Sequence, residues 1–283
     1  MKRPQTITIA LVITALTGVL AACATSPTGR SQLMLVSPES AIVESRKAYV
    51  STVRQLDAED KLLDDPLLAD RVQVITGRVV AVAVNDYPRT RDWDWSVALI
   101  DGPETVNAWC MAGGRMAVYS GLFEKLKLTD AEFAQIMGHE IAHALANHTA
   151  EQMSMAMATS AGVIAAAVAS ENKGATLAGA ALAAQLAITL PNSRTAESEA
   201  DVIGIRLAAK AGYDPQAAVT LWEKMEAEGG GGRIEFLSTH PSPGNRRGKL
   251  QAMVPDMRAI QRKEYGDPWP VDIIREGEGN TVR

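Results

Sequence analysis

The sequence of 283 residues contains only two cysteines, four histidines and 5% aromatic residues. Two cysteines are too few for a four-cysteine zinc site or for a framework of several disulfides. Any metal site must therefore use histidine and carboxylate ligands. The shortage of aromatic residues, in a chain with 47% hydrophobic residues and abundant alanine, favours helices packed through small side chains over a β-sandwich.

Basic residues are in the minority. The chain has 28 lysines and arginines against 33 aspartates and glutamates, which gives a formal net charge of −5. No cluster of basic residues offsets this charge, so the composition argues against binding to nucleic acid. The hydrophobic fraction is high enough for a sizeable core, which excludes an intrinsically disordered chain.

Residues 1–22 have the pattern of an export signal. Lys2 and Arg3 precede an apolar run at residues 7–20, which is shorter than the about 20 residues that a membrane-spanning helix needs. The Leu-Ala-Ala-Cys sequence that ends at Cys23 resembles the bacterial lipobox. This resemblance implies that Cys23 is acylated, and the alanine after it implies an outer-membrane lipoprotein that faces the periplasm. The alternative is a plain secretory signal that is cut nearby.

The pattern of the remaining chain predicts a mainly helical α+β fold. Three short segments rich in β-branched and aromatic residues, at residues 95–100, 106–111 and 115–119, predict a small antiparallel β-sheet beside a long helix. We therefore divide the chain into four parts: a signal peptide at 1–22, a lipidated tether at 23–38, the main domain at 39–264 and an extended C-terminal tail at 265–283.

Two features of the sequence allow more than one interpretation. Once Cys23 is acylated, Cys110 has no partner within the chain, and we expect a buried thiol, with an intermolecular disulfide as the alternative. Residues 153–190 are rich in alanine and are interrupted by three polar residues. They predict two helices packed through small side chains, and the alternative is a hydrophobic surface that touches the membrane or a partner.

The sequence His-Glu-Ile-Ala-His at residues 139–143 lies on a predicted helix. Thr129 and Glu132 form a capping box that starts this helix, and an apolar stripe follows. Histidines four residues apart project from one face of a helix and can bind one Zn²⁺. His139 and His143 are therefore predicted ligands, and Glu140 beside them is placed to act on water.

A catalytic zinc site needs a third protein ligand and keeps an open position. On a second predicted helix, Glu197 and Asp201 share one face, whereas Glu199 is turned away toward solvent. Glu197 is the predicted third ligand, and Asp201 is placed to accept the free N–H of a ligating imidazole. His148 follows His143 by five residues, or about 140° around a helix, so we expect a structural or surface role for it.

These motifs resemble the gluzincin metallopeptidases that include HtpX, the CAAX prenyl endopeptidases and BepA, and within them a LoiP-like branch of bacterial lipoproteins. The similarity covers roughly residues 28–261. The motifs that carry it are His139-Glu-Ile-Ala-His143, Glu197-Ser-Glu-Ala-Asp201, His240-Pro241, Arg246, Asn107-Ala108, Gly113-Gly114 and Thr28-Gly29-Arg30. The resemblance implies that Glu197 is the third zinc ligand, that Asp201 supports the ligands, and that the loop containing His240 lies over the site with Arg246 near it.

The predicted activity is zinc-dependent endopeptidase action, with one Zn²⁺ per chain and Glu140 as the general base. The expected substrates are unfolded or misassembled envelope proteins, and an envelope protein partner is a further expectation. The alternative is a zinc-stabilised lipoprotein that assists outer-membrane assembly without proteolysis. Glu140 argues against it, because a structural zinc site needs no general base.

Two further predictions concern substrate binding and the segment that contains His240. The strand predicted at residues 115–119 precedes the His-Glu-Ile-Ala-His helix, and we expect it to bind an extended substrate at the sheet edge. Its residues are Arg115, Met116, Ala117, Val118 and Tyr119. Four glycines at residues 229–232 predict a hinge before His240. His240 then either donates a hydrogen bond to the reacting oxyanion or occupies the open metal position as a latch.

Overall fold

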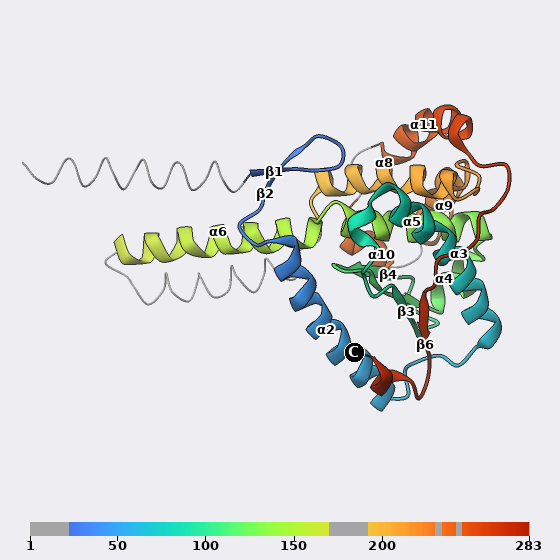
Figure 1. Ribbon diagram of the computed structural model, residues 1–283, viewed down its shortest axis with the longest axis horizontal. Helices are drawn as coiled ribbons and strands as arrows, with labels where there is room; N and C mark the ends of the chain where they lie inside the picture. The colour runs from blue at the N-terminus through green and yellow to red at the C-terminus, as the bar shows by residue number, and fades with distance from the viewer. Residues whose placement is uncertain (1–22, 170–191, 230–233, 242–244, 283) are drawn as a thin grey trace, which may run out of the picture. The chain divides into compact units, whose positions relative to one another are not determined.

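The computed structural model describes residues 23–169, 192–229, 234–241 and 245–282 (Figure 1). The chain divides into two compact units, one formed by residues 1–37 with 150–189 and the other by residues 38–149 with 190–283. The predicted signal peptide, most of the predicted glycine hinge and the second half of the alanine-rich segment lie outside the described residues. The signal peptide at 1–22 therefore stays a prediction.

The first unit contains a β-hairpin and most of helix α6 (His148–Ala169). Strands β1 (Cys23–Thr25) and β2 (Ser31–Leu33) pair antiparallel, and Gly29 has the positive φ that their turn requires. Arg30 donates two hydrogen bonds of 2.6 Å to the Glu151 carboxylate on α6. The segment expected to be a tether therefore contains a hairpin fixed by a bidentate ion pair.

The second unit is built from helices around one sheet, which confirms the predicted mainly helical α+β class. Its described helices are α2 (Pro38–Ala58), α3 (Pro66–Asp86), η1 (Pro88–Thr90), α4 (Gly121–Leu126), α5 (Asp130–Leu145), α8 (Arg194–Lys210), α9 (Ala217–Gly229), α10 (Glu235–Thr239), α11 (Arg246–Ile260) and η2 (Gly279–Thr281). Its strands are β3 (Ser96–Ile100), β4 (Ala108–Met111), β5 (Arg115–Tyr119) and β6 (Asp272–Ile274).

The sheet is mixed, not antiparallel throughout as predicted. Its order is β4-β5-β3-β6, and only the β4–β5 pair is antiparallel, whereas β3 pairs parallel with both β5 and β6. The chain leaves β3, passes to the outside as β4 and turns back, which inserts β5 between β3 and β4. Continuous burial along β3 and β5 agrees with their interior positions.

The C-terminal tail contributes to this sheet. We expected residues 265–283 to extend over the surface, but β6 pairs with β3, and Val271, Ile274 and Val282 are buried. Asp57 at the end of α2 accepts hydrogen bonds from the backbone N–H groups of Gly277 and Gly279. These contacts fix the tail, and the buried side chains add to the core.

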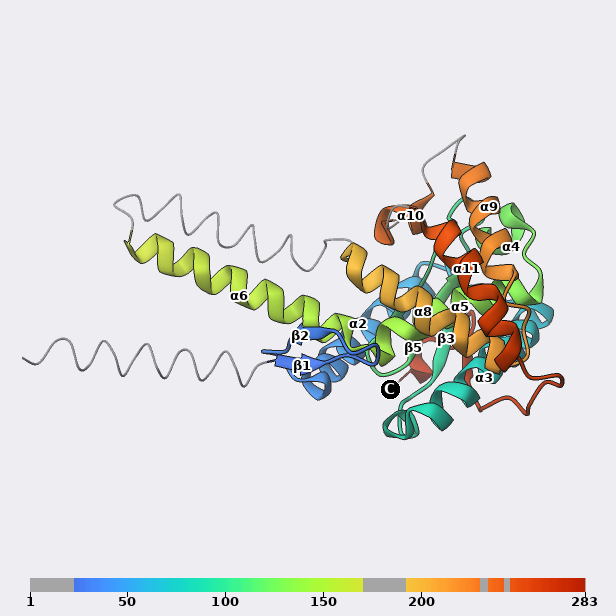
Figure 2. The same ribbon diagram turned by 90° about the horizontal axis from the view of Figure 1, so that it is seen from above.

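Helix α5 lies at the centre of the second unit and packs against α8, α3, α9 and β4 (Figure 1). Helix α11 packs against both α8 and α9 (Figure 2). The predicted capping box is present, because Thr129 accepts from the Glu132 N–H and Glu132 accepts from the Thr129 N–H. The helix therefore begins at Asp130, as the sequence predicts.

Two glycines bring α5 and α8 into backbone contact. A Cβ atom at Gly138 would lie 2.7 Å from the Gly204 carbonyl oxygen, and a Cβ atom at Gly204 would lie 2.7 Å from the His139 nitrogen. Any larger residue at either position would separate the helices. The predicted close packing of these two helices is confirmed, and it sets the distance between the side chains of the site.

Among the described residues, no helix is both long enough and apolar enough to span a bilayer. Helix α6 carries Met155 and Met157 with about half of each side chain exposed.

Candidate metal centre

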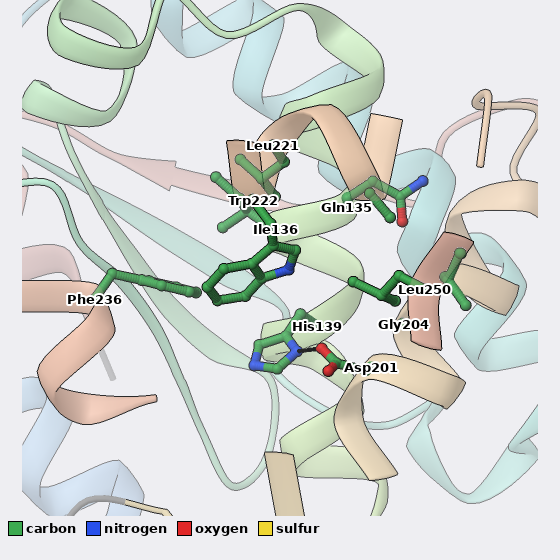
Figure 3. Close-up of a pocket in the computed structure, with 11 residues that line it drawn as sticks. Gln135, Ile136, His139, Asp201, Gly204, Leu221, Trp222, Phe236 and Leu250 are labelled. Carbon is green, nitrogen blue, oxygen red and sulfur yellow. Dashed lines mark ion pairs between the residues drawn. The ribbon is translucent and has the colours of Figure 1, made fainter. Parts of the chain in front are cut away.

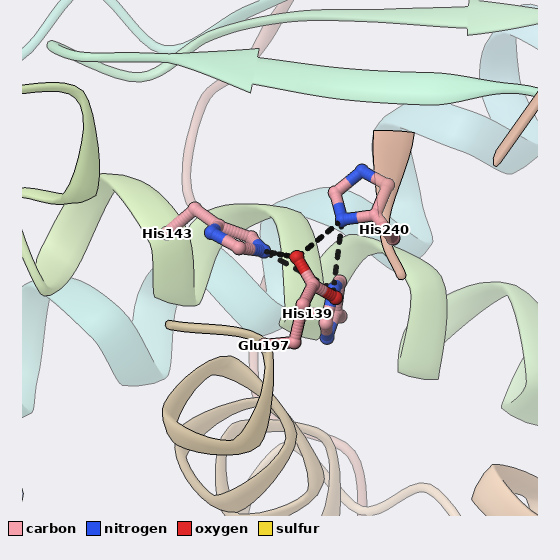
Figure 4. Close-up of side chains that lie close together, drawn as sticks. All are labelled: His139, His143, Glu197 and His240. Carbon is pink, nitrogen blue, oxygen red and sulfur yellow. Dashed lines mark hydrogen bonds and ion pairs between the residues drawn. The ribbon is translucent and has the colours of Figure 1, made fainter. Parts of the chain in front are cut away.

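Four buried side chains from three segments converge in the second unit (Figure 4). His139 and His143 project from α5, Glu197 projects from the first turn of α8, and His240 follows α10. One nitrogen or oxygen atom of each residue lies within 4.8 Å of the corresponding atoms of the others. Their convergence joins residues that are up to 101 positions apart in the sequence.

The separations within this cluster match those of a tetrahedral zinc site. Nε2 of His139 lies 3.1 Å from Nε2 of His143 and 3.3 Å from Nδ1 of His240. Oε1 of Glu197 lies 3.0 Å from Nδ1 of His240 and 3.4 Å from Nε2 of His143. Ligands about 2.0 Å from a tetrahedral Zn²⁺ lie about 3.3 Å from one another. The donor set of three imidazoles and one carboxylate therefore fits zinc.

The electrostatics of the cluster also suit a cation. Burial raises the pKa of Glu197, but hydrogen bonds from His139, His143 and His240 outweigh burial and hold that pKa well below its usual range. Burial lowers the pKa of His143 far below its usual value. Glu197 is thus ionised and His143 is neutral, which are the protonation states that metal ligands require.

Asp201 and Arg246 lie behind the cluster. Oδ1 of Asp201 is 3.1 Å from Nδ1 of His139 and accepts hydrogen bonds of 3.0 and 2.5 Å from Nε and Nη2 of Arg246. Nη1 of Arg246 lies 3.3 Å from Oε2 of Glu197, and the guanidinium stacks on Trp222 at 3.7 Å. Arg246 therefore holds Glu197 and Asp201 of α8 in place, and the predicted position of Asp201 is the observed one.

Asp201 and Glu197 also determine the charge of His139. Burial lowers the pKa of His139, but hydrogen bonds to Asp201 and then Glu197 outweigh burial and raise that pKa to about 9. Because a metal ligand must be deprotonated at the ligating atom, metal binding at Nε2 releases a proton near neutral pH.

Glu140 lies beside the cluster without belonging to it. Its carboxylate is buried, its Oε1 has no hydrogen-bond partner within the described residues, and Nε2 of His240 is 3.4 Å away. Burial raises the pKa of Glu140, although His240 and His139 act against it. A carboxylate with a raised pKa at this position is suited to take and return a proton.

The structure places His148 and Glu199 differently from the sequence prediction. Both are buried, which gives His148 the structural one of its two expected roles, whereas Glu199 was expected to face solvent. Nδ1 of His148 lies 2.8 Å from Nδ1 of His143, and Nε2 of His148 lies 3.1 Å from Oε2 of Glu199. The expected angle between His143 and His148 assumed one continuous helix, but α5 ends at Leu145 and Asn147 has a φ of +55°.

The predicted substrate strand is not available for strand addition. Strand β5, which holds Arg115 to Tyr119, pairs with β3 on one side and β4 on the other, so its backbone groups are occupied. The Arg115 side chain is buried and forms an ion pair with Asp94. The assignment of Arg115, Met116, Ala117, Val118 and Tyr119 to substrate binding is therefore wrong. Strand β4 is the edge strand on this side of the sheet.

A small cavity of about 20 Å³ lies beside the site (Figure 3). His139, Asp201, Trp222 and Phe236 are among the residues that line it. Its volume is enough for about one water molecule and too small for a peptide side chain. This cavity therefore cannot admit a peptide to the cluster.

Comparison with known proteins places the fold and the cluster in one family. The profile described as Peptidase family M48 matches residues 66–254, which include every member of the cluster and Glu140. This chain belongs to peptidase family M48. Peptidases of family M48 are zinc-dependent, so membership confirms both the predicted resemblance and the predicted zinc cofactor.

Three relatives illustrate the breadth of the similarity to this M48 chain. The mitochondrial metalloendopeptidase OMA1 of Schizosaccharomyces pombe is 33% identical over 204 residues, which cover 71% of this chain and 58% of that protein. The Bos taurus OMA1 is 32% identical over 247 residues, or 83% and 46% of the two chains. The β-barrel assembly-enhancing protease of Escherichia coli K12 is 30% identical over 217 residues, or 74% and 43%. The chain thus spans about half the length of these relatives.

Proposed function

We propose that this chain is a zinc-dependent endopeptidase of the cell envelope. The observation that carries the proposal is the convergence of His139, His143 and Glu197 at zinc-ligand separations, with the carboxylate of Glu140 beside them. Three protein ligands and an adjacent proton acceptor make up a catalytic zinc site, whereas a structural site has no use for the acceptor.

The proposed reaction assigns a separate role to each residue. Zinc, when bound, lowers the pKa of water and polarises a carbonyl group. Glu140 takes the proton of the attacking water and passes it to the amine nitrogen that leaves. Asp201 accepts the Nδ1–H of His139, and Arg246 keeps Asp201 and Glu197 oriented through its contacts with both.

The position of His240 supports the latch alternative over the oxyanion donor. Its Nδ1 belongs to the ligand cluster, its Nε2 is 3.4 Å from Glu140, and its ring stacks on Phe236 with centroids 4.4 Å apart. In this position the imidazole fills the space that a substrate carbonyl needs next to Glu140. We propose that His240 must move before substrate binds.

We propose that substrates bind along the free edge of β4. Within the described part of the chain this strand pairs only with β5, and it packs against the helix that carries the ligands. Burial raises the pKa of the Cys110 thiol on β4, and the charge of nearby Glu140 raises that pKa further. An extended peptide that adds to this edge would pass the site, which favours unfolded segments over folded domains.

The location and the substrate class rest on the sequence and the relatives. The lipobox-like sequence supports acylation of Cys23 and attachment to the outer membrane facing the periplasm. The name of the Escherichia coli relative, a β-barrel assembly-enhancing protease, supports unfolded or misassembled envelope proteins as substrates. Replacing Cys23 by serine should abolish labelling by a palmitate analogue and release the protein from the membrane fraction.

The decisive experiment compares the purified protein with Glu140→Gln on an unfolded outer-membrane protein. The substitution should keep zinc bound, because Glu140 is not in the ligand cluster, and should lower cleavage by about 10²-fold or more. Zinc content is measured in both samples. Cleavage at the wild-type rate by the variant would refute the role of Glu140, and zinc binding without cleavage by either protein would favour the assembly-factor alternative.

A further inference from the structure

His148 and Glu199 are buried ionisable residues that the proposed reaction does not use. His148 is the first residue of α6, and Glu199 lies on α8 two residues after the ligand Glu197. Both side chains are only about 3% exposed. Burial of a histidine and a carboxylate is costly unless each is paired, so their contacts call for an explanation.

Their contacts form a linear chain that ends at a predicted metal ligand. Oε2 of Glu199 lies 3.1 Å from Nε2 of His148, and Nδ1 of His148 lies 2.8 Å from Nδ1 of His143. The opposite nitrogen of His143, Nε2, faces His139 and Glu197 in the cluster. Both ring nitrogens of each histidine are therefore engaged, and the carboxylate is the terminal acceptor.

The direction of the hydrogen bonds follows from the chemistry of the carboxylate. We take Glu199 as a carboxylate that accepts and His148 as a neutral imidazole, so that Nε2–H of His148 donates a hydrogen bond to Glu199. A neutral imidazole has one N–H, so Nδ1 of His148 is left as an acceptor. Nδ1 of His143 must then donate to His148, which leaves the lone pair of His143 on Nε2, on the side of the cluster.

The turn that follows α5 brings His148 to His143. Asn147 adopts the left-handed conformation, with φ of +55°, and α6 begins immediately after it. Asparagine tolerates this conformation better than most residues. The change of direction returns His148 toward His143, and Glu199 reaches it from the face of α8 that does not carry Glu197 and Asp201.

We propose that His148 and Glu199 are positioning residues that fix the tautomer and orientation of His143 for zinc. The inference rests on the proposed role of His143 as a ligand. Glu199 holds the proton on Nε2 of His148, and His148 in turn holds the proton on Nδ1 of His143. Without this chain, a proton on Nε2 of His143 competes with the metal for the same lone pair.

A pair of substitutions at His148 separates positioning from packing. His148→Asn keeps an acceptor, because its amide oxygen can occupy the place of Nδ1, whereas His148→Phe keeps the ring and loses the acceptor. Zinc affinity is measured by competition with a chromophoric chelator. We expect about 10- to 100-fold weaker binding for His148→Phe and near wild-type binding for His148→Asn. Wild-type affinity in His148→Phe would overturn the proposal.

Glu199 is tested in the same way. Glu199→Gln retains an acceptor oxygen and should bind zinc much as the wild type does, whereas Glu199→Leu should weaken binding by about tenfold or more. Ser198→Ala, at a half-buried neighbouring position on α8, is the matched control. Equal losses in Glu199→Gln and Glu199→Leu would assign the effect to packing or charge and would overturn the proposed tautomer role.

The absorption spectrum of the cobalt-substituted protein provides a readout that does not depend on activity. A rotated or lost His143 ligand should change the d–d bands in His148→Phe and Glu199→Leu, and the acceptor-retaining variants should restore them. Unaltered bands in all four variants would overturn the proposal. Wild-type protein that binds zinc without cleaving substrate would refute the proposed function and leave this inference standing.

Discussion

Replacing Gly204 by alanine tests whether the contact between α5 and α8 sets the geometry of the metal centre. The new Cβ atom would lie 2.7 Å from the His139 nitrogen and 2.9 Å from the Gly138 carbonyl carbon. Both neighbours are backbone atoms of α5, so no side-chain rotation relieves the contact. Carbon atoms pack at about 3.5 to 4.0 Å, and the helices must therefore separate by roughly 0.7 Å.

The expected effect of Gly204→Ala on stability is opposite in sign to the effect of helix propensity. Alanine is favoured over glycine within a helix by about 1 kcal/mol, which alone would stabilise the protein. Overpacking of a tight interface costs about 1 to 3 kcal/mol, and we expect it to dominate. After the propensity gain is subtracted, the net cost is at most about 2 kcal/mol, which for a unit of this size corresponds to a drop of up to roughly 8 °C in the melting temperature.

The metal centre should report the same displacement. Glu197 and Asp201 lie on α8, and a shift of about 0.7 Å exceeds the roughly 0.2 Å tolerance of metal–ligand distances. Zinc affinity, measured by chelator competition, should therefore fall by about tenfold or more.

Gly266→Ala is the matched control for Gly204→Ala, because a Cβ atom there meets only the end of the Arg262 side chain at 3.2 Å. A Gly204→Ala protein with a wild-type or raised melting temperature and unchanged zinc affinity would refute the reasoning.

Three further predictions concern the cluster itself. Glu197→Gln removes the ligand charge and should lower zinc content at least tenfold; full occupancy after dialysis would contradict the assignment. His240→Ala should raise basal peptidase activity with zinc still bound, because the imidazole no longer fills the substrate side; lowered turnover would instead make His240 an oxyanion donor. A proton on His139 competes with zinc up to its pKa of about 9, so zinc affinity should rise by about tenfold per pH unit between pH 6 and 8, and an affinity independent of pH would contradict this.

The ligand positions could be predicted from sequence because they depend on local helical geometry. Residues four apart on a capped helix project from one face whatever the rest of the chain does, which placed His139 beside His143 and Glu197 beside Asp201. The small residues around Gly204 also indicated that the second helix could pack closely. Both steps need only the helical repeat and side-chain size.

The sheet could not be predicted in the same way, because strand order depends on partners distant in sequence. Periodicity located the strands at residues 95–100, 106–111 and 115–119 but did not decide which of them lies at the edge. The parallel pairing of β3 with β5, and of β3 with β6 from the tail, joins segments that share no local signal. The interior position of β5 follows from that pairing.

The contact between His148 and His143 was not foreseen, for a more specific reason. The angle of about 140° between His143 and His148 holds only if one helix continues through both. Asn147 interrupts it with a positive φ, and an asparagine directly before a histidine was the available signal for that interruption. The expectation that Glu199 faces solvent was therefore also wrong, because Glu199 is buried against His148.

The edge of β4 and the histidine of the predicted latch are connected through α10. The Phe236 N–H donates to the Val106 carbonyl oxygen, and Asn107 donates to Glu235, so α10 is bound to the chain just before β4 begins. His240 ends the same short helix and stacks on Phe236. A peptide that extends along β4 toward Val106 would compete for this carbonyl, and its release would loosen α10. On this proposal, substrate binding along β4 would loosen the helix that ends at His240.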